Sequence, residues 1–392
     1  MLTHLGLTPS FGFGDRLGLA TPGHIAAVQG TDIAPIFAQQ SVRENARTGR
    51  TPFQVMNDAK RAVDEMGWQG SWGADADHLK SPEDLPPFVD AGFTFFTIDP
   101  GEFVDNDADS DSLHTLQDKF RISERKDVGW DQLSALYLSH NQVFDFGEFD
   151  DETLLRAEIK YGKAIQHTIK MYQALLQLKD LFDFEISVDE TNSPTTPLEH
   201  YFIANELSRA GVKFTSLAPR FIGRFEKGVD YIGDLALLDA EMAKHAAVTA
   251  LFGTYKMSLH SGSDKFSVYP LISKYWGKHL HVKTAGTSYL EALRVLAVRE
   301  PTLFTNIWNL ALARYPQERA TYHVSAEIGK IPAKMDLFAL LDEFNARQIL
   351  HVTFGSALAQ YGQDLKLALI KHADLYSTFL QKHFSKHLDL LN

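Results

Sequence analysis

The sequence predicts an α/β protein with a (β/α)8 TIM-type barrel. Eight short apolar runs alternate with stretches of helical periodicity, and no hairpin signal lies between consecutive runs. Parallel strands joined by helices explain this order, and eight such strands close into a barrel. We expect residues 1–392 to form one barrel domain, with a helical insertion after strand three at about 100–150, over the barrel mouth. A helical excursion at 300–345 is expected before strand eight.

The predicted strands are short and rich in aromatic and β-branched residues. They are expected at residues 10–16, 71–80, 93–98, 182–188, 212–218, 255–259, 280–287 and 348–354. Helical spacing of apolar residues predicts helices at 51–66, 82–91, 152–179, 198–210, 235–252, 270–276 and 364–391, with a broken helical region at 289–345. A doubly wound open sheet is the competing layout, and it would separate the polar residues at the strand ends.

Composition excludes several classes of function. The chain is 44% hydrophobic and 22% charged with a formal net charge of −12, and its lysines and arginines form no runs, so neither a nucleic-acid nor a membrane partner is expected. No apolar run approaches about 18 residues and no signal peptide opens the chain, which predicts a cytoplasmic protein. Cysteine is absent, so any metal would be held by His, Asp and Glu.

Polar and charged residues gather where the predicted strands end. They are Asp77, His78, Glu190, Arg220, His260, Lys265, His281 and Lys283. In a barrel of this kind the carboxyl ends of the strands carry the active site. We therefore expect these side chains to meet at one face of the molecule.

Three of these residues are histidines that form a candidate first shell for a divalent cation. His78, His260 and His281 lie at or beside strand ends, and neutral imidazoles suit Zn, Ni, Mn or Fe. A single histidine is more often structural than a ligand, so the hypothesis depends on their convergence. His351, on the predicted eighth strand, is a reserve ligand or substrate contact. Arg220, Arg224 and Lys227 are the local concentration of positive charge that an anionic substrate group would meet.

Five sequence blocks together resemble one known family. They are residues 12–18 (GFGDRLG), 75–80 (DADHLK), 189–190 (DE), 260–265 (HSGSDK) and 281–287 (HVKTAGT). In combination they resemble the tagaturonate/fructuronate epimerase family of hexuronate catabolism. The resemblance implies a metal-dependent isomerase acting on a small keto-uronate and interconverting D-tagaturonate and D-fructuronate.

The resemblance also implies roles for individual residues. Asp77 would be the proton acceptor, Glu190 the proton donor, and His78, His260 and His281 the metal ligands. The residues expected to contact substrate are Asp15, Arg16, Asp75, Lys80, Asp189, Arg220, Arg224, Asp264, Lys265, Lys283 and His351.

The two keto-acids differ at a hydroxylated carbon that is β to the ketone, so simple enolisation does not invert it. Retro-aldol cleavage and re-addition would, with the metal polarising the ketone and one carboxylate taking the hydroxyl proton. A hydride route would need a nicotinamide site, and the sequence has no strand-GxGxxG-helix unit.

Two alternatives stay open at this point. Residues 282–286 (VKTAG) also resemble the Schiff-base segment of class I aldolases, in which Lys283 would form an imine without a metal. The other alternative is a non-catalytic barrel that binds a sugar acid.

Overall fold

The computed structural model describes residues 1–123, 129–138 and 144–391, and its centre is a closed barrel of eight parallel strands. Each strand pairs with its neighbours in chain order, and β8 closes on β1. The strands are β1 Ser10–Gly14, β2 Ala34–Ser41, β3 Gly73–Leu79, β4 Phe95–Ile98, β5 Asp183–Ser187, β6 Ser216–Ala218, β7 Lys256–Leu259 and β8 Leu280–Thr284. The predicted TIM-type fold class is confirmed.

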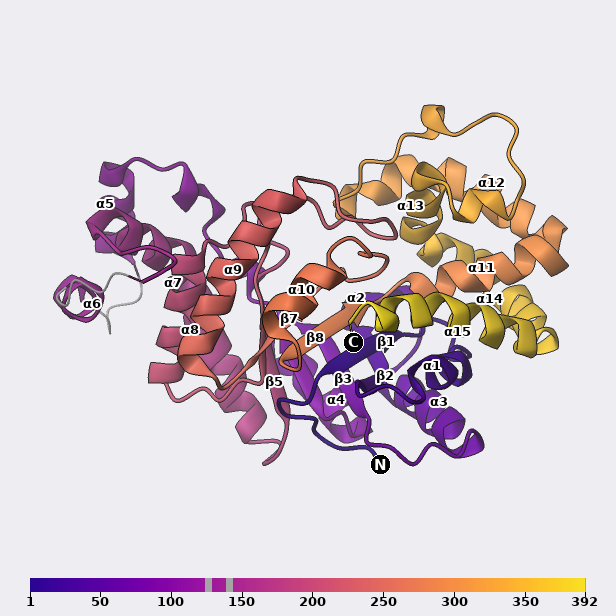
Figure 1. Ribbon diagram of the computed structural model, residues 1–392, viewed down its shortest axis with the longest axis horizontal. Coiled ribbons are helices and arrows are strands. Elements are labelled where there is room, and N and C mark those ends of the chain that lie inside the picture. Colours follow the sequence, from indigo (N-terminus) through magenta and orange to yellow (C-terminus); the bar gives the residue numbers. More distant parts are fainter. Residues whose placement is uncertain (124–128, 139–143, 392) are drawn as a thin grey trace.

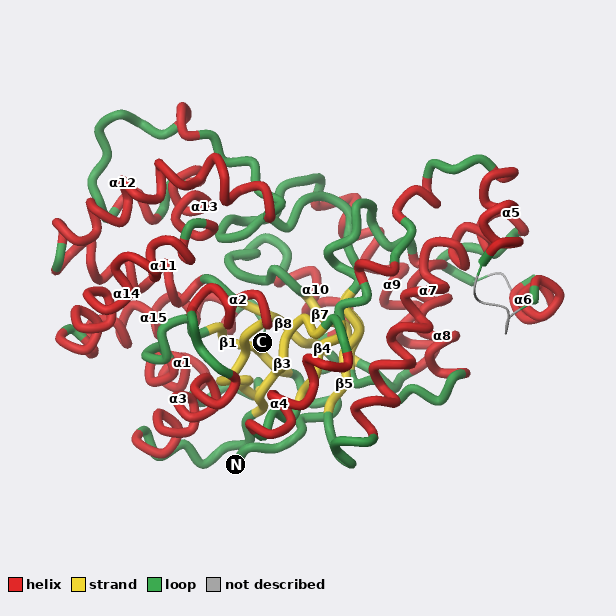
Figure 2. The backbone as a smooth tube through the Cα atoms, turned by 180° about the vertical axis from the view of Figure 1, so that it is seen from behind, coloured by secondary structure: helices red, strands yellow, loops and turns green. Residues whose placement is uncertain are grey.

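Helices surround the barrel, with α5 to α9 gathered on one side and α11 to α14 on the other (Figures 1 and 2). The α-helices are α1 Thr21–Val28, α2 Val42–Thr48, α3 Pro52–Glu65, α4 Leu85–Ala91, α5 Leu113–Ile122, α6 Trp130–Tyr137, α7 Asp151–Leu176, α8 Pro197–Arg209, α9 Leu235–Phe252, α10 Tyr269–Trp276, α11 Thr287–Arg299, α12 Pro301–Glu318, α13 Phe344–Val352, α14 Phe354–Lys371 and α15 Ala373–Asp389. Short 3-10 helices lie at Pro82–Asp84, Gly101–Phe103, Asn106–Asp109, Arg319–Thr321, Ile328–Lys330 and Ala339–Leu341. In the described part of the chain, no helix is long and apolar enough to cross a membrane.

Local sequence signals explain where these helices begin. Helix α3 has a capping box between Thr51 and Gln54 and a proline at its first position. Helix α8 repeats this arrangement with Thr196, Pro197 and Glu199. Both helices then bury an apolar face against the rest of the molecule.

The helical insertion follows β4, which was the third strand of the prediction. It comprises α5, α6 and two 3-10 helices, and it lies against α7 at one end of the molecule (Figure 1). Parts of the predicted 100–150 insertion, residues 124–128 and 139–143, lie outside the described residues.

Strand β2 was missing from the prediction. Its sequence, APIFAQQS, contains a proline, two glutamines and a single β-branched residue, so it has little of the composition of a strand. Pro35 is tolerated because it lies at the start of the strand, in register with Phe11.

The predicted eighth strand at 348–354 was wrong, because these residues belong to α13 and the start of α14. A short segment rich in Ile, Leu, Val and Phe fits a buried strand and a buried helix equally well. Glu343 favours the helix, because its side chain accepts a hydrogen bond from the Ala346 amide and caps α13. The helical excursion consequently follows β8, the last strand, instead of preceding it.

The interior of the barrel carries charged residues. Lys256 and Lys283, from β7 and β8, are buried there together with Asp75 and Glu185, from β3 and β5. Barrels of this type are usually filled by Val, Ile and Leu. Buried charges are tolerated only when they are paired and hydrogen-bonded, so this interior indicates a functional site.

Candidate active site

Lys283 is the centre of a buried ion network. Its Nζ lies 2.6 Å from Asp75 Oδ2, 2.8 Å from Asp77 Oδ1 and 2.9 Å from Glu185 Oε1, and it donates a hydrogen bond to Thr97. Burial alone would lower the pKa of Lys283, but the three carboxylates outweigh it and raise the pKa well above its usual value. Lys283 is therefore a permanently charged ammonium.

The network affects its carboxylates differently. Burial raises the pKa of Asp75, because Lys283 only partly offsets the loss of water around its carboxylate. Burial acts in the same direction on Asp77, but His78 and Lys283 outweigh it and lower the pKa of Asp77. Asp77 is thus an ionised carboxylate at the mouth of the barrel, in position to accept a proton.

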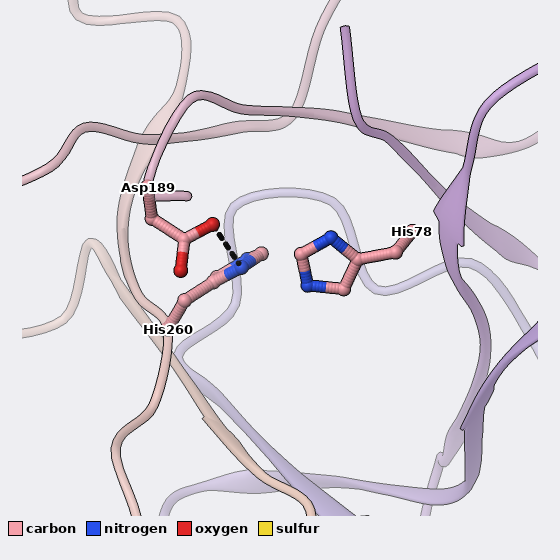
Figure 3. Close-up of side chains that lie close together, drawn as sticks. All are labelled: His78, Asp189 and His260. Carbon is pink, nitrogen blue, oxygen red and sulfur yellow. Dashed lines mark ion pairs between the residues drawn. The ribbon is translucent and has the colours of Figure 1, made fainter. Parts of the chain in front are cut away.

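His78, Asp189 and His260 form a compact group at the mouth of the barrel (Figure 3). One potential ligand atom from each lies within 4.8 Å of those of the other two. His260 Nδ1 is 3.2 Å from Asp189 Oδ1, and the rings of His78 and His260 lie edge to face with centroids 5.2 Å apart. Two imidazoles and a carboxylate are a donor set that suits Fe, Mn, Ni or Zn.

The local backbone explains how Asp77 and His78 both reach the mouth. Successive side chains of a regular strand point to opposite faces. The pairing of β3 with β4 is irregular between Ala76 and Leu79, and His78 has φ +51, in the left-handed region that is uncommon for residues other than glycine. Ser261, directly after His260, also has positive φ. Such conformations concentrate at functional sites.

The surroundings of this group favour a cation. Burial would lower the pKa of His78 and of His260, but nearby carboxylates raise these values to about 10 and about 9. For His78 the principal carboxylate is Asp77, and for His260 it is Asp189. The same negative potential would attract a divalent ion, whose binding would displace the ring protons. His78 Nδ1 is moreover buried and forms no hydrogen bond, with Asp99 Oδ2 at 3.6 Å, so the residues fit a metal centre.

His281 does not belong to this group. Its Nδ1 is 2.9 Å from Ser10 Oγ, and its ring packs on Phe95 with centroids 5.2 Å apart. It precedes Lys283 by two residues on β8, so it faces the barrel interior one layer below the mouth. Burial lowers its pKa to about 3. The structure thus places Asp189, and not His281, beside His78 and His260.

Two adjoining cavities open at this site. The smaller, of about 30 Å³, is lined by Gln39, Asp77, His78, Asp189, Lys227, His260, Ser261, Ser263, Lys283, Ala285 and His351. The larger, of about 380 Å³, has walls formed by residues 219–227 and 322–325 and contains Glu190, Arg220 and Arg224. Asp189, Lys227, His260 and Ser261 line both cavities.

Glu190 is more exposed than its predicted role suggested. Its carboxylate lies 3.4 Å from Arg43 on the wall of the larger cavity, whereas it does not line the smaller one. Glu185, which the sequence analysis did not select, lies closer to the histidines, with Oε1 2.7 Å from His260 Nε2. The signal for Glu185 was a carboxylate within a buried strand, DFEIS.

Several predicted substrate contacts have structural partners. Asp15 accepts backbone hydrogen bonds from Leu17, Gly18 and Ala20, and Arg16 pairs with Glu44 and stacks on Phe354. Asp264 pairs with Arg347, Lys265 donates to three backbone carbonyls, and Lys80 lies near Asp99 and Glu102. None of these five predicted residues lines either cavity. His351 does line the smaller one, but it arrives from α13 instead of a strand.

A family model described as "UxaE: tagaturonate epimerase" matches residues 3–391 of the chain. The chain belongs to the tagaturonate epimerase family. The relationship covers both the barrel and the helices that surround it, so the resemblance of the sequence blocks is confirmed.

Members of the tagaturonate epimerase family are similar to the chain in sequence and in structure. The chain is 45% identical to the tagaturonate/fructuronate epimerase of Thermotoga maritima over 396 residues, which cover 98% of this chain and 81% of that protein. A glycerol-complexed crystal structure of the fructuronate-tagaturonate epimerase UxaE from Cohnella laeviribosi is 40% identical with a TM-score of 0.94. A second structure, with two glycerols, is 39% identical with a TM-score of 0.95. Both alignments cover 100% of this chain and 83% of the other.

Proposed function

We propose that this protein is a metal-dependent epimerase that interconverts D-tagaturonate and D-fructuronate. The observation that carries the proposal is the group of His78, Asp189 and His260, which lies beside the Asp77–Lys283 ion pair and opens into a cavity lined by Arg220 and Arg224. This arrangement supplies a cation site, a base and positive charge for a carboxylate. It matches the chemistry of a keto-uronate, and the family relationship supports the same substrate.

We assign the cation ligands to His78, Asp189 and His260. A divalent cation bound there would polarise the substrate ketone and stabilise negative charge that develops on its oxygen. His281 stays available only as a more distant group, because its Nδ1 faces Ser10. Glu185 accepts from His260 Nε2 and orients the imidazole.

Asp77 is the proposed proton acceptor. It would take the proton of the substrate hydroxyl on the carbon that is inverted, and Lys283 and His78 keep it ionised for that purpose. Loss of this proton allows the bond between this carbon and its neighbour on the ketone side to break, with the bonding electron pair passing to the ketone to give an enolate. Rotation of the resulting aldehyde exposes its other face. Re-formation of the bond then gives the epimer. Glu190 is proposed to return the proton from the wall of the larger cavity.

The class I aldolase alternative conflicts with the state of Lys283. Imine formation needs a neutral amine. Three carboxylates within 2.9 Å hold Lys283 as an ammonium, so it is a poor nucleophile. Borohydride reduction in the presence of substrate tests the point: mass spectrometry should find no adduct on Lys283, and an adduct there would favour the aldolase.

The decisive experiment follows D-tagaturonate by NMR in deuterated water with Mn²⁺- or Ni²⁺-loaded protein. We expect D-fructuronate to appear, and we expect chelation by EDTA to abolish the reaction and added metal to restore it. Inversion without deuterium at the new centre supports carbon–carbon cleavage, whereas deuterium there supports a carbanion at that carbon. Tight binding of tagaturonate without conversion would establish the non-catalytic barrel instead.

A further inference from the structure

Lys227 occupies the junction of the two cavities. It is half-buried and lines both of them, and its Nζ donates a 2.7 Å hydrogen bond to Ser261 Oγ, in the residue that follows His260. Among the residues that the structure describes, no ion pair involves Lys227. Its charge therefore faces the site without a carboxylate to neutralise it.

The other cations near the site differ from Lys227 either in their ion pairs or in the cavity that they line. Lys283 forms ion pairs with three carboxylates. Arg224 lies 3.4 Å from Glu226 and its side chain is 56% exposed, while Arg220 lines only the larger cavity. Among the described cations near the site, Lys227 is thus the one that forms no ion pair and lines both the cavity at the His78–Asp189–His260 group and the larger cavity.

The backbone around Lys227 is held by two buried cations from other elements. Lys265 donates to the carbonyls of Glu226 at 2.7 Å and Val229 at 2.5 Å. Arg347, on α13, donates to the carbonyl of Gly228 at 2.7 Å. Three of the four carbonyls in residues 226–229 are thereby fixed, and Gly228 has φ +73, a conformation that favours glycine.

The side chain of Glu226 forms hydrogen bonds with residues other than Lys227. Its Oε2 accepts hydrogen bonds from Gln348 Nε2 at 2.7 Å and from the amide and hydroxyl of Ser325. The neighbouring carboxylate is thus held away from Lys227. Binding costs less free energy when the loop that carries the lysine is already ordered, so a fixed backbone at residues 226–229 favours binding by the half-buried Lys227.

We propose that Lys227 binds the carboxylate of the substrate, and that Lys265 and Arg347 act as positioning residues that hold it at the junction of the cavities. A keto-uronate whose ketone lies at the His78–Asp189–His260 group would extend its carboxylate toward this ammonium. The inference rests on the proposed function and deepens it, because it makes Lys227 the residue that selects an acid over a neutral sugar.

The first test compares Lys227→Met, Lys227→Arg and Lys213→Met in the metal-loaded protein. Lys213 is an exposed lysine that precedes β6 and lines neither cavity, and it serves as the matched control. A charge-assisted hydrogen bond accounts for about 10- to 100-fold in binding, so we expect the KM for D-tagaturonate to rise by that factor in Lys227→Met with little change in kcat. Lys227→Arg should recover part of the loss, and Lys213→Met should behave as wild type.

A neutral ligand separates charge recognition from general damage. Calorimetric titration with D-tagatose, which has a hydroxymethyl group in place of the carboxylate, should give similar Kd values for wild type and Lys227→Met. An equal loss of affinity for both ligands, or an unchanged KM for D-tagaturonate, overturns the inference. If the wild-type protein does not epimerise D-tagaturonate at all, the proposed function fails instead, so the two failures are distinguishable.

The positioning role is tested by a double-mutant cycle. Arg347→Lys keeps the charge beside Asp264 but loses the planar fork that also reaches the Gly228 carbonyl. We expect the KM to rise several-fold with kcat unchanged, and no further rise when Arg347→Lys is combined with Lys227→Met. An additional rise in the double variant would mean that Arg347 does not act through Lys227.

Discussion

The imidazole of His260 lies between two carboxylates, with its Nε2 only 2.7 Å from Glu185 Oε1. Glu185 is buried in the barrel and also contacts Lys283, so it connects the ion network with the proposed cation group. Residues that orient a metal-ligating side chain contribute strongly to the affinity of the site for the metal. This relationship gives the first prediction.

Replacing Glu185 by glutamine should weaken metal binding. We expect the Kd for Mn²⁺ to rise about 10- to 100-fold, because the neutral amide no longer orients His260 or adds negative charge. Calorimetric titration of the metal-free protein with Mn²⁺ measures the change. Glu102→Gln, an exposed replacement near Lys80, is the control. An unchanged Kd in a variant with a normal melting temperature would contradict the role given to Glu185.

Asp77→Asn should abolish most of the activity while retaining the metal. Loss of a general base lowers kcat by about 10²- to 10⁴-fold. Lys283 keeps Asp75 and Glu185 as partners, so the fold should persist, which circular dichroism checks. Asp189→Asn should behave differently, since it removes a proposed ligand and weakens Mn²⁺ binding. Full activity in Asp77→Asn would place the base elsewhere.

Buried neutral histidines should make the protein sensitive to acid. Burial lowers the pKa of His24 to about 4, and its Nε2 lies 2.8 Å from Ser288 Oγ. Between pH 6.5 and about 4 the unfolded chain binds a proton at this position and the folded protein does not, so stability falls as the pH falls.

The His24→Asn variant measures how much His24 contributes to this pH dependence of stability. Removing the residue should reduce the slope of unfolding free energy against pH by up to about 1.4 kcal/mol per pH unit in that window. Urea denaturation at several pH values measures the slope. His114→Asn, at a side chain that is 80% exposed, should leave it unchanged. If plots of unfolding free energy against pH were parallel for wild type and His24→Asn, His24 would not be the buried neutral histidine that we describe.

Gly286→Ala should displace His351 from the smaller cavity. A Cβ at Gly286 would lie 1.9 Å from His351 Cε1, which no rearrangement of the ring within its present site accommodates. We expect kcat/KM to fall about 10- to 100-fold, the effect of misplacing a group by about 1 Å. Gly355→Ala, where the nearest neighbour is a side chain at 3.7 Å, is the control for a tolerated alanine. Equal activity of both variants would exclude His351 from the reaction.

Sequence reasoning predicted the barrel because repeated alternation of strands and helices is a global signal. It failed for individual strands where composition and structure disagree. Ala34–Ser41 contains a proline and two glutamines but pairs on both sides, whereas residues 348–352 include Ile349, Leu350 and Val352 but form a buried helix. In both cases tertiary packing outweighed local preference.

The site was predictable to the extent that its residues follow strand ends. His78, His260, Asp77 and Lys283 all lie there, and the structure brings them together. The prediction placed His281 with His78 and His260, but His281 lies two residues before Lys283 on β8 and therefore deeper in the barrel, and the sequence does not show how deep along a strand a side chain lies. Lys265 looked like a substrate contact, but its three carbonyl partners come from distant or irregular segments that periodicity does not describe.

The single ammonium that neutralises Asp75, Asp77 and Glu185 comes from the last strand of the barrel. A nascent chain that ends before Leu280 carries these three acids with His78 and His260 but without this ammonium, and burying them in that state is costly. Synthesis must therefore pass Lys283 before the inner layer can dehydrate, which makes the final maturation of this enzyme a late and concerted event.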